Sequence, residues 1–361
     1  MTRSPTRLRC AILGASGYIG QHFARLLGDH PVFELTLLVG SDRNSGQRLS
    51  DLWQLSEECP PAASDLRLRS VGPAEIARRG VDLVFSGLPS GTAGRVETEL
   101  ARRGVDVFTN ASDHRMDPRV PLLVPEVNAD HLDALVRGRG ARSGLIVADP
   151  NCSAAGLVVA LRPVWDLLRP RAVHVTTYQA LSGAGLLGVA SLAITDNVVP
   201  FIAREEEKVA AESQRMLGSV AGRAVRPSAV PFVVHCARVG VRDGHLEAIT
   251  VEARQRPSQG ALERAWMRFD PLVGHGLPTA PHPAIALRSE TDRPQPVRDR
   301  WAGSPARARG MAVSVGRVRW EAPYLRFFAL SHNAVRGGAG GSVLNAELAA
   351  ERGYLGRGRA T

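Results

Sequence analysis

The sequence predicts an α/β protein in which a doubly wound parallel sheet is followed by an α+β region. Short apolar segments alternate with amphipathic segments up to about residue 150, as expected for strands joined by right-handed crossover helices. Longer apolar segments after residue 170 are typical of a mixed or antiparallel sheet. A chain of 361 residues accommodates two domains, and we place the boundary near residue 150.

The elements of the first region follow one another in a regular order. Each predicted strand is a short apolar run that ends in a glycine, serine or asparagine turn, and each helix has apolar residues at a helical period. This alternation predicts strands at 8–13, 33–39, 81–86, 105–110 and 144–148, with helices at 21–27 and 95–103.

The second region has a different pattern. It begins with a helix and continues with longer strands, and a glycine cluster precedes a closing helix that we expect to return to the first domain. Residues 255–309 are rich in proline and arginine and receive no assignment. The pattern predicts helices at 154–168, 205–217 and 342–351, and strands at 172–181, 230–241, 246–253, 311–318 and 325–331.

Cysteine usage and hydropathy indicate a cytoplasmic protein without a metal site. The four cysteines, Cys10, Cys59, Cys152 and Cys236, form neither a CxxC pair nor a disulfide framework. No apolar run is long enough for a membrane span. The basic residues at 1–9 lead into a run that soon reaches Gly14, which indicates a first strand and not a secretion signal.

The net charge of +10 leaves two interpretations open. Nucleic-acid binding is one, but the arginines are scattered singly, without a basic block, so we favour solubility and a mild field that attracts phosphorylated ligands. Lys208 is the only lysine among the 45 basic residues. A single lysine among so many arginines can be a matter of chance. It can also mark a site that needs a compact ammonium group, which the planar guanidinium of arginine does not replace.

A glycine turn joins the first strand to the first helix. The spacing Gly14-x-x-Gly17-x-x-Gly20 in a strand–turn–helix context predicts a dinucleotide site of the Rossmann type, because backbone N–H groups and the helix N-terminus favour a pyrophosphate. A plain tight turn is the alternative. The expected cofactor-binding residues here are Gly14, Ser16, Gly17, Tyr18, Ile19 and Gly20.

The end of the second strand favours NADP over NAD. Ser41, Arg43 and Ser45 are suited to a 2′-phosphate, whereas an NAD site usually has an acidic residue at this place. Asp42 argues for NAD, and an ordinary solvated loop is the third interpretation.

Cys152 lies between a predicted strand and a predicted helix. A thiol at a helix N-terminus is close to the positive end of the dipole, which lowers its pKa and favours the thiolate. Small residues at 153–156 leave space for a substrate. A lone cysteine is otherwise more often buried and inert, so the local sequence leaves both roles open.

Several ordered blocks resemble aspartate-semialdehyde dehydrogenase of the archaeal and fungal type. The most specific are Pro-Asn-Cys-Ser-Ala-Ala-Gly-Leu at 150–157, Gln-Ala-Leu-Ser-Gly-Ala-Gly at 179–185, Glu-Glu-Glu-Lys at 205–208 and Asp-Gly-His at 243–245. Further blocks at 110–117, 196–202, 235–239, 292–296, 310–317 and 333–337 extend the resemblance over nearly the whole chain.

The resemblance implies a two-domain architecture and a reaction. Residues 1–150, completed by 331–361, would form a Rossmann-like NADP-binding domain, and 151–330 a catalytic and dimerisation domain of a homodimer or homotetramer. The enzyme would reduce L-4-aspartyl phosphate to L-aspartate 4-semialdehyde with NADPH, reversibly, through a thioester on Cys152. Phosphate would be the second product.

The resemblance also implies residue roles. Cys152 would be the nucleophile, His245 the acid–base catalyst, and Gln179 the residue that orients the acyl group. The substrate would be held by Arg238 at its carboxylate, Glu206 at its amino group, Arg115 and Lys208 at its phosphate, and by Asn151. The cofactor region would further include Ser86, Ser182, Gly183 and Asn333.

Local interpretations without a catalytic role compete with these assignments. His245 follows a turn signal and fits a hairpin, Arg238 fits a half-exposed strand surface, and 205–208 fits a solvated helix start. Cys236 is expected to be structural, on the same strand face as Arg238.

Two alternatives for function stay open. The chain departs from the family at Ala203, Arg204 and Ala237, near the expected substrate region, so another acyl donor such as malonyl-CoA is the second hypothesis. A catalytically silent NADP-binding regulatory subunit is the third.

Overall fold

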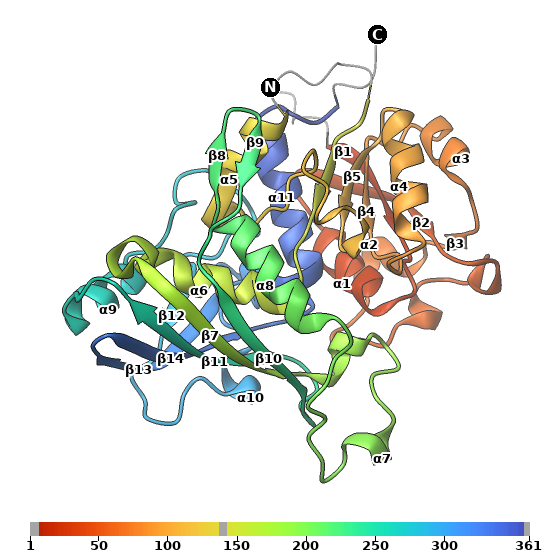
Figure 1. Ribbon diagram of the computed structural model, residues 1–361. Helices are drawn as coiled ribbons and strands as arrows, with labels where there is room; N and C mark the ends of the chain where they lie inside the picture. Colours follow the sequence, from red (N-terminus) through yellow and green to blue (C-terminus); the bar gives the residue numbers. More distant parts are fainter. Residues whose placement is uncertain (1–6, 137–142, 357–361) are drawn as a thin grey trace.

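The computed structural model describes residues 7–136 and 143–356, and it contains two six-stranded sheets (Figure 1). The first six residues, part of the stretch interpreted as preceding a strand, lie outside the described residues. Within the described residues, no helix is long and apolar enough to cross a membrane, and no cluster of three or more His, Cys, Asp or Glu side chains is placed to hold a metal ion.

The first sheet is parallel throughout and doubly wound, with strand order β3-β2-β1-β4-β5-β6. The predicted strands 8–13 and 33–39 are confirmed to the residue. The strands are β1 (Leu8–Leu13), β2 (Phe33–Val39), β3 (Leu68–Arg69), β4 (Leu83–Ser86), β5 (Asp106–Thr109) and β6 (Ile146–Ala148). The helices around them are α1 (Tyr18–Leu27), α2 (Pro61–Ser64), α3 (Pro73–Arg78), α4 (Ala93–Arg102) and α5 (Pro125–Val136).

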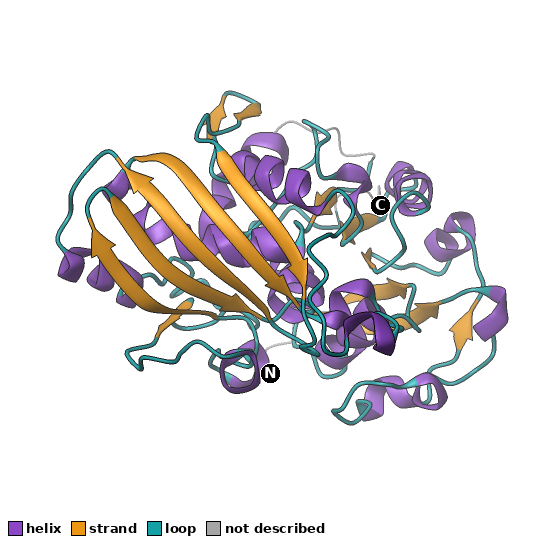
Figure 2. Ribbon diagram, turned by 60° about the horizontal axis from the view of Figure 1, so that its bottom comes forward, coloured by secondary structure: helices purple, strands orange, loops and turns teal. Residues whose placement is uncertain are grey.

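The second sheet is mixed, as expected, with strand order β10-β7-β11-β14-β13-β12. Figure 2 shows one broad face of this sheet, with helices behind it. Buried and half-buried residues alternate along β11, so one face packs on helices and the other stays partly open. The strands are β7 (Pro170–Gln179), β10 (Phe232–Arg238), β11 (His245–Ala253), β12 (Ile285–Leu287), β13 (Val313–Glu321) and β14 (Tyr324–Ser331).

The remaining elements surround the second sheet. They are α6 (Cys152–Leu168), α7 (Ser191–Ile194), α8 (Glu205–Met216), α9 (Gln259–Met267), α10 (Pro296–Asp299) and α11 (Gly340–Glu351), with a hairpin of β8 (Ser219–Ala221) and β9 (Ala224–Arg226). The elements that were not predicted are the helices α2, α3, α5, α7, α9 and α10 and the strands β3, β8, β9 and β12. Asn128 has a non-helical conformation inside α5, and β12 has only three residues. For these reasons neither α5 nor β12 gives a clear hydrophobic period in the sequence.

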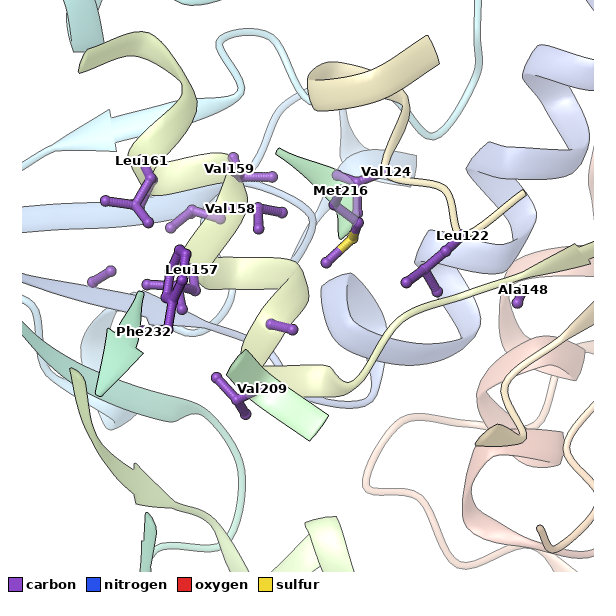
Figure 3. Close-up of a cluster of buried hydrophobic side chains, with 14 of the residues drawn as sticks. Leu122, Val124, Ala148, Leu157, Val158, Val159, Leu161, Val209, Met216 and Phe232 are labelled. Atoms are coloured by element: carbon purple, nitrogen blue, oxygen red, sulfur yellow. The ribbon is translucent and has the colours of Figure 1, made fainter. Parts of the chain in front are cut away.

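Helix α6 is the central element of the core. It begins directly after β6, and its apolar side chains pack against α8 and β10, as Figure 3 shows for Leu157, Val209 and Phe232. The indole N–H of Trp266 on α9 donates to the Ala160 carbonyl at 2.8 Å, which ties a second helix to α6. The first turn of α6 is therefore held at the junction of the two sheets.

The chain returns to the first sheet after β14. A turn at 335–339 leads into α11, which packs beside α1 and β5 (Figure 1). The guanidinium of Arg336 in this turn forms an ion pair with Glu126 of α5, and each side chain is 1% exposed. The expected return of the C-terminal helix to the first domain is confirmed. The domain boundary near residue 150 stays a prediction.

The segment at 301–309 also crosses to the first domain. Arg307 donates to the Leu26 carbonyl and to Asp29 at the end of α1. The guanidinium groups of Arg25 and Arg309 each lie over the Trp301 ring, at 5.5 and 5.3 Å from its centroid. These contacts attach the segment at 301–309 to α1.

We predict that breaking the buried ion pair destabilises the protein strongly. Glu126→Ala leaves the Arg336 guanidinium charged in the core, so the free energy of unfolding should fall by about 3 kcal/mol or more. Urea unfolding at neutral pH measures the loss. The exposed pair of Arg79 and Glu75, with each side chain 39% exposed, is the matched control. Glu75→Ala should cost no more than about 0.5 kcal/mol, and an equal loss in both variants would contradict the prediction.

Candidate active site

A cavity of about 290 Å³ lies where the first turn of α6 meets both sheets. Its walls come from the glycine turn, from the loops after β4 and β5, from β7 and β10, and from α8. Among the predicted site residues it is lined by Tyr18, Ile19, Arg115, Asn151, Cys152, Gln179, Ser182, Gly183, Lys208, Arg238 and Asn333. A larger cavity of about 780 Å³ at the β12 edge of the second sheet contains no cysteine or histidine.

The thiol and the imidazole predicted to react together are in contact. Cys152 Sγ lies 3.1 Å from His245 Nε2, although 93 residues separate them. Cys152 is the first residue of α6 and His245 the first of β11. Gly337 packs against the backbone of Cys152, because a Cβ at 337 would lie 2.6 Å from its Cα. The return of the C-terminal segment therefore depends on glycine at this place.

His245 is not a hairpin residue. Strands β10 and β11 are not neighbours, since β7 lies between them in the sheet. The Ala180 N–H donates to His245 Nδ1 at 3.0 Å. A backbone N–H can only donate, so Nδ1 must be the unprotonated nitrogen, and the imidazole proton is on Nε2, which faces Sγ.

Both partners are neutral in this environment. Burial, and then the nearby Arg238 guanidinium, lower the pKa of His245 to about 3. Burial, and then Glu205, raise the pKa of the Cys152 thiol to about 12, against the opposing effect of Arg115, Arg238 and the Ser153 backbone. The expectation of a lowered thiol pKa is therefore wrong for this structure, because desolvation outweighs the helix dipole and the two arginines.

Asn151 shapes the turn that presents the thiol. Its Oδ1 accepts from Ser153 N at 2.9 Å and Ala154 N at 3.2 Å, which is the N-cap of α6. Its Nδ2 donates to Glu205 Oε1 at 2.8 Å, and the same oxygen accepts from Gln179 Nε2 at 3.0 Å. The N-cap residue thus links the nucleophile helix to Gln179 through one carboxylate.

The structure corrects the choice of glutamate. Glu205 is buried and lines the cavity, whereas Glu206 is exposed and its carboxylate accepts from the Cys236 backbone N–H at 3.0 Å. The first turn of α8 carries three consecutive glutamates, and only the helix orientation determines which one points inward. Because Glu205 is buried, residues 205–208 are not the fully solvated helix start that was the alternative interpretation.

The two site arginines come from different domains. Arg238 on β10 is 7% exposed, and its Nη1 donates to the Ala180 carbonyl at 2.7 Å. Arg115 follows β5, and its Nη2 donates to the Asn110 carbonyl at 2.7 Å. Cys236 is buried on the face of β10 that carries Arg238, while Ala237 points to the other face. The departure from the family at Ala237 therefore does not reach the cavity.

The glycine turn has the geometry of a nucleotide loop. Gly14 has φ of +70°, and a Cβ at Gly20 would lie 2.2 Å from the Gly14 carbonyl oxygen. Tyr18 donates its hydroxyl proton to Asp243 Oδ1 at 2.5 Å, which connects this turn with the loop before His245. Ser16 Oγ accepts from Asn44 Nδ2 at 3.0 Å, so the loop after β2 contacts the turn.

Ser182 and Asn333 meet on the opposite wall. Asn333 Nδ2 donates to Ser182 Oγ at 2.9 Å, and Asn333 Oδ1 accepts from Gly244 N at 2.9 Å. A Cβ at Gly183 would lie 2.7 Å from Arg238 Nη1 and 3.2 Å from His245 Cε1, so a larger residue there would have to displace the Arg238 guanidinium or the His245 ring.

The other predicted cofactor residues lie outside the cavity. Ser41, Arg43 and Ser45 are exposed in the loop after β2, and Asp42 of this loop accepts from the Ser70 hydroxyl. Ser86 is 0% exposed at the end of β4. Its inclusion is corrected, because a side chain pointing into the core does not contact a cofactor.

Sequence reasoning missed Ser90, Asn110, Ser112 and Glu205 among the lining residues. The first three follow β4 or β5, and the carboxyl ends of parallel strands meet at the ligand edge of such a sheet. That rule could have found them. Nothing local distinguishes Glu205 from its two neighbours.

Two family models match the chain in succession. The first, described as semialdehyde dehydrogenase, NAD binding domain, matches residues 9–135, and the second, described as semialdehyde dehydrogenase, dimerisation domain, matches residues 161–336. Together they span most of the chain. The first covers β1–β5 of the parallel sheet, and the second covers all six strands of the mixed sheet.

Individual proteins show the same likeness over nearly full length. An aspartate-semialdehyde dehydrogenase of Archaeoglobus fulgidus is 43% identical, covering 95% of this chain and 98% of the relative. A malonyl CoA reductase (NADP) of Metallosphaera sedula is 35% identical, with 96% and 98% covered. A crystal structure of aspartate semialdehyde dehydrogenase with NADP from Candida albicans superposes with a TM-score of 0.86 at 33% identity, covering 97% of this chain and 100% of that one.

We predict that alkylation of Cys152 by iodoacetamide accelerates by about tenfold per pH unit between pH 7 and 10, because only the thiolate reacts and the thiol pKa lies at about 12. Peptide mass spectrometry measures labelling at Cys152, and a Cys59→Ser background removes the other partly exposed thiol. A fast, pH-independent rate between pH 5 and 8 would indicate a thiolate–imidazolium pair and contradict the neutral pair described above.

Proposed function

The chain belongs to the aspartate-semialdehyde dehydrogenase family, and from that premise we propose that it interconverts L-4-aspartyl phosphate and L-aspartate 4-semialdehyde with NADP(H) through a thioester on Cys152. It is accordingly an oxidoreductase with an NAD(P)-binding domain. The contact of 3.1 Å between Cys152 Sγ and His245 Nε2, in a cavity that the glycine turn also lines, carries the proposal.

In the first half-reaction Cys152 acts as a nucleophile. Sγ attacks the acyl carbon, the bond from that carbon to the phosphate oxygen breaks, and phosphate leaves with the electron pair. The thiol proton ends on the phosphate, so that the products are a thioester and hydrogen phosphate. Arg115 and Lys208, both at the cavity, supply positive charge for the leaving group.

The residues present fit a nicotinamide dinucleotide. A Cβ at Gly14 would lie 2.8 Å from the Gly87 carbonyl oxygen, so the turn stays narrow and its backbone remains accessible to a pyrophosphate. Tyr18 and Ile19 extend this surface into the cavity with Cys152. When bound there, NADPH supplies the hydride that reduces the thioester carbon.

His245 serves the second half-reaction as a donor. Its Nε2–H faces Cys152 Sγ, which lines the cavity, and from there it stabilises the negative charge that develops on the acyl oxygen during reduction. When the oxygen lone pair re-forms the carbonyl, the bond from carbon to Sγ breaks and the electron pair returns to Sγ, which takes up one proton from solvent and becomes a neutral thiol again. For Nε2 to act as a base, its own proton would first have to move to Nδ1. The Ala180 N–H already donates to Nδ1 and therefore opposes a proton there.

The remaining side chains support recognition of an amino acid. Arg238 offers a guanidinium to the α-carboxylate. Glu205, in place of Glu206, offers a carboxylate to the amino group, and Gln179 beside it orients the acyl group. Asn151 keeps its predicted place at the substrate, although its side chain also caps α6.

NADP is the cofactor we propose, with NAD the weaker candidate. Arg43 is exposed beyond β2, where a 2′-phosphate would lie, and the Asp42 carboxylate is engaged by Ser70. The Candida albicans relative was crystallised with NADP, and the name of the Metallosphaera sedula relative specifies NADP.

We also propose a homodimer or homotetramer in the cytoplasm. The match at 161–336 is described as a dimerisation domain, and the second sheet leaves one face partly open (Figure 2). All four cysteines are free, which suits a reducing compartment. No nucleic-acid or membrane partner enters this proposal.

We predict phosphate-dependent formation of NADPH from L-aspartate 4-semialdehyde and NADP, and complete loss of this activity in Cys152→Ser. Initial rates at 340 nm, with phosphate or coenzyme A as the acceptor, measure it. Activity with coenzyme A alone would instead support an acyl-CoA reductase such as the Metallosphaera sedula relative. No activity with either acceptor would favour a silent NADP-binding subunit.

We predict that Arg43→Ala raises the KM for NADP by about tenfold, the equivalent of one charge-assisted hydrogen bond. The smaller activity with NAD should change by less than about twofold, since NAD lacks the 2′-phosphate. Arg48→Ala in the same exposed loop is the matched control. Equal effects on both cofactors would show that Arg43 does not contact the 2′-phosphate.

A further inference from the structure

Helix α8 carries three buried charged side chains on one face. Glu205, Glu212 and Arg215 are 7%, 2% and 5% exposed, and spacings of seven and three residues place them on the same side of a helix. Buried charges persist only when each has a partner. All three find their partners in the active site or in the loop that holds Arg115.

Glu212 contacts two separate parts of the site. Its Oε1 lies 3.2 Å from Arg115 Nη1, and its Oε2 accepts from the Asn151 backbone N–H at 2.6 Å. Asn151 is the N-cap of α6, and Cys152 follows it directly. One carboxylate thus joins the guanidinium assigned to the phosphate with the turn that presents the nucleophile.

The other two buried charges of α8, Glu205 and Arg215, hold further parts of the same site. Glu205 holds the side chain of Asn151, while Glu212 holds its backbone. Arg215 donates to the carbonyl oxygens of Arg115, Asp117 and Val120, at 2.5, 2.7 and 2.8 Å. The backbone of the Arg115 loop is therefore fixed by Arg215, and Glu212 is left to fix the direction of the guanidinium.

From these contacts we infer that Glu212 is a positioning residue that sets the Arg115 guanidinium at the correct distance from Cys152 for an acyl phosphate. The inference rests on the proposed function. Arg115 is held from two sides, by Glu212 at Nη1 and by the Asn110 carbonyl at Nη2. Its remaining N–H groups can then face the cavity without the side chain having to be ordered on binding.

Glu212→Gln tests this role with little change of shape. The amide oxygen can still accept from the Asn151 N–H, but the amide NH₂ then faces the Arg115 guanidinium, donor against donor. Arg115 loses its charged anchor while the N-cap of α6 is kept. The variant therefore separates the two contacts of Glu212.

We expect Glu212→Gln to raise the KM for phosphate by about tenfold, the size of one charge-assisted hydrogen bond. The KM for the semialdehyde should stay within about twofold, a split that a general loss of folding would not produce. Glu207→Gln, an exposed position on the same helix, is the control and should match the wild type. A KM for phosphate that is unchanged or lower would overturn the inference, since it would mean that Glu212 only weakens the field of Arg115.

A second measurement does not depend on turnover. Inorganic phosphate bound at Arg115 should protect Cys152 from iodoacetamide, and the concentration for half-protection should rise by about tenfold in Glu212→Gln. If phosphate protects the wild type and the concentration for half-protection is the same in the variant, the role of Glu212 is refuted while the proposed function stands. Absence of both protection and phosphate-dependent activity in the wild type would instead refute the proposed function. Circular dichroism confirms that each variant is folded.

Discussion

The structure depends on the placement of one helix, α6, whose apolar body packs between α8, α9 and the second sheet while its first turn opens into the cavity. The helix cannot shift without exposing residues such as Leu157 and Leu161, which are fully buried. The packing of the helix body therefore fixes the position of its N-terminal turn. Cys152, which we propose as the nucleophile, is the first residue of this turn.

Around this turn, burial and charge act against each other. Desolvation keeps both the Cys152 thiol and the His245 imidazole neutral. At Cys152 the guanidinium groups of Arg115 and Arg238 only partly offset this effect, whereas at His245 the Arg238 guanidinium adds to it. The same low-polarity surroundings strengthen every hydrogen bond that the site offers to a developing charge.

The two sheets contribute different parts of the chemistry. The parallel sheet supplies loops at the carboxyl ends of its strands, and these hold the glycine turn and Arg115. The mixed sheet supplies β7, β10 and β11, which carry Gln179, Arg238 and His245 at or near their ends. Polar contacts such as Tyr18 with Asp243, and the ion pair of Arg336 with Glu126, join the two parts.

Local sequence indicated most of the longer elements and the chemistry that we propose. Short apolar runs located five of the six strands of the first sheet, because these strands are buried on both faces. Local sequence also located the helices α6, α8 and α11. The glycine turn and Cys152 at a strand–helix junction were likewise visible in short motifs. The order of blocks along the chain then indicated the family and most of the site residues.

Only the tertiary structure decided which side chains meet and with what charge. Glu205 replaced Glu206 because the rotation of α8 against β10 determines which of three identical residues is buried. Ser86 is excluded from the site because its side chain is buried at the end of β4. The role of Glu212 depends on contacts with Asn151 and Arg115, which are 61 and 97 residues away in the sequence. The pKa of Cys152 is raised and not lowered because the packed structure removes the thiol from water. Burial is a property of the packed molecule, and no local motif reports how much water a side chain loses on folding.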